Sequence, residues 1–109
     1  MSQLDLFSAA QRRNVGMQRA ADHADRETPD WRDQAYEFLL TFARANHEFL
    51  SEDFVEAAVS RGIPKPPDGR AWGAIVRRAA VAGAIRRVGA APARTSNCSL
   101  KPVWSAGIP

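Results

Sequence analysis

The sequence contains few of the residues that build disulfides, metal sites or membrane spans. It has one cysteine, Cys98, and two histidines, so an internal disulfide is impossible and a zinc site lacks ligands. No apolar run approaches the roughly 18 residues that a membrane span needs. The N-terminal residues lack the basic start and apolar run of a secretory signal. These absences predict a soluble, cytoplasmic protein without a metal or other cofactor.

Residue patterns suited to catalysis are also scarce. His23 and His47 are distant in the sequence, with no cysteine, serine or acid at a recognisable catalytic spacing. No glycine-rich loop is present that could hold a phosphate. The remaining candidates are acids that we place at helix ends and on exposed faces, where they favour the helix dipole: Asp22, Asp25, Glu27, Asp30 and Asp33. We therefore expect no enzymatic activity.

The charge is divided unevenly along the chain. The 109 residues, 45% hydrophobic and 25% charged, suit one small domain with a tail. Residues 1–63 hold seven Lys or Arg and eleven Asp or Glu, a net charge of −4, whereas residues 64–109 hold eight Lys or Arg and one acid, a net charge of +7. This division predicts that the C-terminal part contacts a polyanion, nucleic acid before others; the alternative is a solvated basic face.

Apolar periodicity predicts three main helices, at about residues 28–45, 51–62 and 68–83. Thr28, followed by proline, and Asp68 are the expected capping residues of the first and third helices. Each of the last two helices is expected to stop at its glycine.

After these helices we expect a β-hairpin, with strands at 84–88 and 100–105 and a loop at 89–99. This order of elements, over about residues 29–106, resembles a winged helix-turn-helix domain. The segment PPDGRAWGAIVRRAAVAGAIRRVG, with PAR and KPVW after it, is also similar to small winged-helix proteins of bacteriophages and prophages. The expected fold is mainly α with a C-terminal β-hairpin, in a winged-helix domain at 14–109.

The third helix has two distinct sides. Its apolar residues, which define the expected core face, are Trp72, Ile75, Val76 and Ala79. On the other side, small residues permit close approach to a major groove, and arginines can reach phosphates or guanine edges. With two cations of the hairpin, the predicted DNA-binding residues are Arg70, Gly73, Ala74, Arg77, Arg78, Arg94 and Lys101. An ordinary amphipathic helix with a basic solvent side is the alternative. We expect Trp31, Trp72 and Trp104 to be core residues.

The N-terminal segment at 1–13 predicts a flexible tail, followed by a short helix at 14–25 capped by Asn14. The tail contains Gln3-Leu4-Asp5-Leu6-Phe7, in which three large apolar residues lie in a polar segment with no evident core to join. Such a cluster is typical of a short linear motif that docks into a partner's pocket. The alternative is that these residues pack on the chain's own helices.

The five residues resemble the bacterial sliding-clamp-binding motif, whose preferred form is Gln-Leu-Ser/Asp-Leu-Phe, and match it at every position. The resemblance implies that Leu6 and Phe7 fill the deep apolar part of the clamp pocket and Leu4 a shallower part. It further implies that Gln3 is hydrogen-bonded at the pocket rim while Asp5 stays largely exposed.

Together these features predict a non-enzymatic DNA-replication accessory factor that binds the bacterial sliding clamp through its tail and double-stranded DNA through its winged helix. One alternative is a phage-type inhibitor that occupies the clamp pocket without binding DNA. Another is a winged-helix transcription regulator. We expect no membrane partner and no small-molecule substrate.

Overall fold

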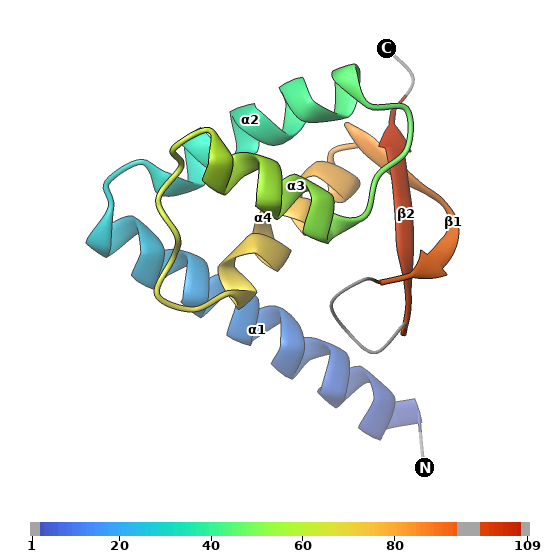
Figure 1. Cartoon of the computed structure of the whole chain (residues 1–109). Helices are drawn as coiled ribbons and strands as arrows, with labels where there is room; N and C mark the ends of the chain where they lie inside the picture. Colours follow the sequence, from blue (N-terminus) through green and yellow to red (C-terminus); the bar gives the residue numbers. More distant parts are fainter. Residues whose placement is uncertain (1–2, 94–98, 108–109) are drawn as a thin grey trace.

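The computed structural model describes residues 3–93 and 99–107, with side chains from Ala9 onward. In these residues, four helices precede a two-stranded antiparallel hairpin (Figure 1). The elements are α1 (Gln3–Glu27), α2 (Trp31–Ala45), α3 (Ser51–Ser60), α4 (Arg70–Val81), β1 (Ile85–Pro92) and β2 (Leu100–Ala106). The predicted fold class is confirmed: the chain is mainly α with a C-terminal hairpin, consistent with a winged-helix-like fold. No helix in the described part of the chain is long and apolar enough to cross a membrane.

The N-terminal helix is longer than predicted. The sequence predicted a flexible tail at 1–13 and a helix at 14–25, but the backbone is one continuous helix from residue 3 to residue 27. Residues 9–13 are alanine, glutamine and arginine, all good helix formers, so no local signal stops the helix there. Asn14 consequently lies inside α1 instead of capping it.

The start of α2 also differs from the prediction. Asp30 has a left-handed φ of 64°, so Thr28 and Pro29 belong to a turn before the helix. The N–H of Arg32 donates to Asp25 Oδ1 at 3.0 Å, which supplies a side-chain acceptor for a free amide in the first turn of α2. This acceptor comes from the end of α1, so a local capping pattern could not reveal it.

The other predicted helix ends are confirmed. Gly62 and Gly83 follow α3 and α4 with φ values of 95° and 78°, the left-handed conformation that glycine adopts without strain. At the start of α4, the N–H of Arg70 donates to Asp68 Oδ1 at 2.9 Å, so Asp68 accepts a backbone hydrogen bond as expected of a capping residue.

The core lies around Trp31, Phe54 and Trp72, from α2, α3 and α4. The Trp72 ring centroid lies 5.0 Å from that of Trp31 and 5.5 Å from that of Phe54, both in edge-to-face geometry. Trp31 Nε1 donates to the carbonyl oxygen of Pro64 at 2.8 Å. This bond satisfies a buried indole and ties the α3–α4 connection to the core.

The hairpin is longer than predicted because residues 89–92 pair with residues 100–103 across it. A register shift between Arg87 and Gly89 marks a bulge in β1. Phe49 and Trp104 exchange two backbone hydrogen bonds of 3.0 and 2.8 Å, which join the hairpin to the segment before α3. Trp104 is partly buried against the core, as predicted.

The core packing predicts the effect of truncating Leu39 in α2, which is completely buried. Leu39→Ala should lower the free energy of unfolding by about 2–5 kcal/mol, because it leaves a cavity among rigidly packed side chains. Urea unfolding followed by circular dichroism measures the change. Leu40→Ala is the matched control, because Leu40 is only half-buried; an equal loss in the two variants would contradict this description of the core.

Candidate nucleic-acid interface

Helix α4 lies at the centre of the molecule and contacts α1, α2, α3 and β1 (Figure 1). The predicted core face is confirmed: Trp72, Ile75, Val76 and Ala79 are buried. Because α1 packs on another side of α4, only a small part of the α4 surface remains exposed to a partner.

This structure does not support the prediction that Gly73 and Ala74 contact DNA, because Ala74 is buried and Met17 of α1 lies over Gly73. Ala74 is 4% exposed, and a Cβ placed on Gly73 would lie 2.7 Å from Met17 Sδ of α1. The small residues do permit close approach of a partner, but that partner is the chain's own first helix. The α1 side of this contact includes the buried residues Ala20, Ala21 and Ala24.

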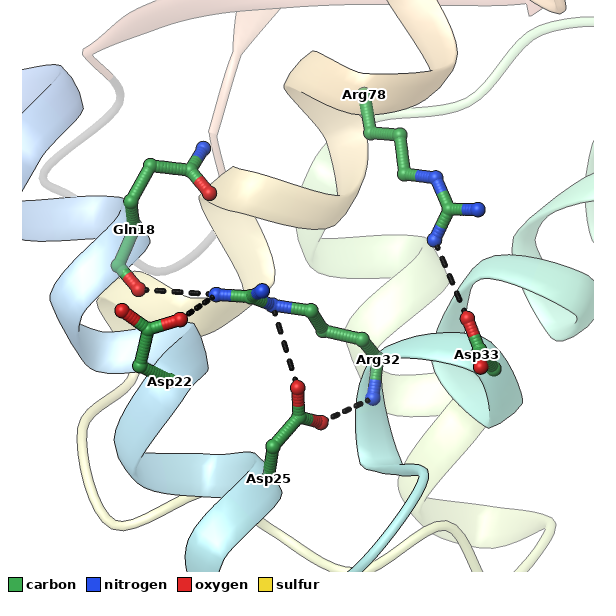
Figure 2. A network of polar contacts seen from close by, with 6 residues as sticks. All are labelled: Gln18, Asp22, Asp25, Arg32, Asp33 and Arg78. Atoms are coloured by element: carbon green, nitrogen blue, oxygen red, sulfur yellow. Dashed lines mark hydrogen bonds and ion pairs between the residues drawn. The ribbon is translucent and has the colours of Figure 1, made fainter.

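A network of polar contacts around Arg32 holds the second half of α1 against the start of α2 (Figure 2). Arg32 Nη2 donates to the carbonyl oxygen of Gln18 at 3.1 Å and pairs with Asp22. Arg32 Nε lies 3.5 Å from Asp25 Oδ2. Asp22 and Asp25 were predicted to act on the helix dipole, but their carboxylates instead join two helices, α1 and α2.

Two of the predicted DNA-contacting arginines have partners within the chain. Arg78 Nη1 lies 3.5 Å from Asp33 Oδ1, and Arg78 Cζ lies 3.9 Å from the centroid of the Tyr36 ring, so this side chain lies against α2 (Figure 2). Arg70 Nη2 donates to Asp68 Oδ2 at 2.7 Å. Both arginines remain exposed, with side chains 50% and 66% accessible, so an anion could still reach them.

One group of cations that is free to bind an anion lies between α1 and α4. The two helices border an open hollow of about 790 Å³, which we call the α1–α4 groove; its lining residues are Ala9, Ala10, Arg12, Arg13, Asn14, Met17, Arg70 and Arg77. Four of the eight are arginines and none is an acid. Within the described residues, Arg12, Arg13 and Arg77 take part in no ion pair.

The sequence prediction missed Arg12 and Arg13 because it assigned them to a tail. The run of helix formers before Asn14 could have predicted the longer helix. No local pattern could predict that this helix packs on α4. The structure therefore groups Arg70 and Arg77 with two arginines of α1, whereas the Arg78 side chain lies against α2.

The remaining predicted contacts lie on the hairpin or outside the described residues. Lys101 is exposed on β2, as are Arg86 and Arg87 on β1, and none of the three lines the α1–α4 groove. Arg94 lies outside the described residues, as do the side chains of Gln3, Leu4, Asp5, Leu6 and Phe7.

Comparisons give no further guide to this surface, because no protein-family model, curated protein or solved structure matches the chain. In the part of the chain that the structure describes, no three His, Cys, Asp or Glu side chains are grouped as a metal ion would require. The chemistry of this surface is thus that of guanidinium groups, which donate hydrogen bonds to oxyanions.

The Asp68–Arg70 pair gives a measurable electrostatic signature. The pKa of Asp68 is lowered from 3.8 to about 2, because the Arg70 side chain and backbone N–H both donate to its carboxylate. Since the folded-state pKa lies below the unfolded value, this carboxylate contributes stability above about pH 4, and the contribution is lost as the pH falls through about 2. An NMR titration of the Asp68 carboxyl carbon measures this pKa. Arg70→Ala should return it toward 3.8; a wild-type pKa already near 3.8 would contradict the pairing.

Proposed function

We propose that this protein is a cytoplasmic, non-enzymatic DNA-replication accessory factor that binds the bacterial sliding clamp and DNA. The observation that carries the proposal is that one helix, α1, includes both the clamp-motif residues Gln3–Phe7 and two arginines of a basic groove. An apolar docking motif beside a cationic surface suits a protein that works where the clamp surrounds DNA.

The position of the motif favours access by a partner. The N-terminal end of α1 points away from the rest of the fold (Figure 1). The first turn of any helix has free backbone N–H groups and opens at little cost, so the segment can adapt to a pocket. Burying Leu6 and Phe7 would contribute a few kcal/mol before ordering costs, which corresponds to about micromolar affinity for so short a motif.

The nucleic-acid half of the proposal is supported by the charge distribution. The unpaired arginines of the groove and the exposed hairpin cations Arg86, Arg87 and Lys101 all lie on described surface free of neighbouring carboxylate partners within 4 Å. Guanidinium groups of this kind bind phosphates through bidentate, charge-assisted hydrogen bonds.

A second candidate function is a clamp-pocket inhibitor with no role for DNA. The burial of Ala74 and the position of Met17 over Gly73 favour it, because little of α4 is then left that could enter a major groove. The same observation removes support for a sequence-reading transcription regulator.

Clamp binding should depend on the two pocket-filling residues. Leu6→Ala with Phe7→Ala should abolish capture of the purified bacterial sliding clamp in a pull-down, with and without DNA present. The melting temperature should stay unchanged, because the motif assigns both side chains to the partner's pocket and not to the core of this chain.

The matched control is Asp5→Ala, which should bind the clamp as well as the wild type does, because the motif leaves this position exposed. Absence of clamp binding by the wild type would overturn the proposal. So would a fall in the melting temperature of the double variant, since Leu6 and Phe7 would then belong to the fold.

A further inference from the structure

We infer that the α1–α4 groove binds a short stretch of single-stranded nucleic acid. This inference rests on the proposed function for the class of ligand, a nucleic acid. It adds that the ligand is single-stranded and that it binds in the groove to which both helices contribute, and not on the side of α4 that was predicted to enter a major groove.

The arginines of the groove suit a phosphodiester backbone. Arg12 and Arg13 are neighbours on α1, whereas Arg70 and Arg77 are seven residues apart, about two turns, on α4. Cations therefore line both walls, and three of the four are unpaired within the described residues. A flexible strand that lies between two such walls can bring successive phosphates to both.

The rest of the lining suits a base. Ala9, Ala10 and Met17 provide apolar surface on the α1 side. Asn14 also lines the groove, and its side-chain oxygen Oδ1 is buried without a hydrogen-bond partner within the described residues. A rotation of this side chain into the groove would let its amide pair with the polar edge of a base, and guanidinium planes can stack on base faces.

The dimensions favour a single strand over a duplex. A volume of about 790 Å³ lies in the range of sites for small organic ligands, roughly 300–1,000 Å³, and so admits a nucleotide or two. A duplex keeps its bases stacked inside, so its base edges are reached only by a helix or strand pair that enters one of its grooves. The α1–α4 groove is concave, so a duplex could meet only its rim.

The test measures binding of a fluorescent single-stranded oligonucleotide and of the matching duplex by anisotropy, with the full chain. The wild type should bind the single strand more tightly. Four phosphate contacts on a single strand predict a slope of about −3 in log affinity against log salt. Arg12→Ala with Arg13→Ala should reduce the slope to about −1.4 and weaken binding by about tenfold or more at low salt.

The matched control is Arg44→Ala with Arg61→Ala, which removes the same charge from exposed arginines outside the groove and should retain most of the affinity.

Arg77→Ala tests the α4 wall separately and should weaken binding without disturbing α1. Asn14→Ala should weaken binding several-fold while leaving the salt slope unchanged, because it removes no charge. Circular dichroism melting of each variant separates lost binding from lost folding.

Equal loss in the Arg12/Arg13 variant and the control would overturn the inference. Preference for the duplex, with loss confined to Arg86, Arg87 or Lys101 variants, would also overturn it while leaving the proposed function standing. Displacement of the strand by a mononucleotide at equal concentration would make the groove a small-molecule site and overturn it. If the wild type binds neither DNA form, the DNA half of the proposed function fails as well, and the clamp pull-down decides the other half independently.

Discussion

The arrangement of this molecule depends on the close contact between α1 and α4. Gly73 allows α1 to approach until Met17 fills the space above it, and the alanines Ala20, Ala21 and Ala24 are buried in the same packing. The Arg32 network fixes the far end of α1 to α2. As a result α4, the helix that a winged-helix protein would present to DNA, becomes an interior element, and its neighbour α1 supplies one wall of a new groove.

The features that the sequence predicted correctly are those encoded within one element. The spacing of Trp72, Ile75 and Ala79 defines the buried side of α4 because helical periodicity needs no knowledge of the partner. Gly62 and Gly83 end helices because only glycine adopts the required φ without strain. The hairpin strands follow from their own residues, although the length of β1 was set by pairing with β2.

The features that the sequence could not predict involve distant partners. The small residues Gly73 and Ala74 indicate that a partner can approach the helix closely, but the partner can be either a DNA groove or a second helix. Net charge along the chain was also an incomplete guide: Arg12 and Arg13 belong to the acidic half yet line the basic groove, whereas Arg78 of the basic half is engaged by Asp33 and Tyr36. Summed charge ignores which side chains the fold brings together.

The position of the clamp motif on α1 connects the two proposed binding events. Arg12 follows Phe7 by five residues, about 7.5 Å along a helix, so a partner docked on the motif stands beside the groove. If the clamp binds α1 as a helix, the groove keeps both walls and the clamp places DNA next to it. If the clamp unwinds α1 past Arg13, one wall is lost and nucleic-acid binding weakens. Because coupling between two binding sites is reciprocal, a recruiting factor should bind nucleic acid more tightly when the clamp is bound, whereas a clamp-pocket inhibitor with no role for DNA should show no coupling.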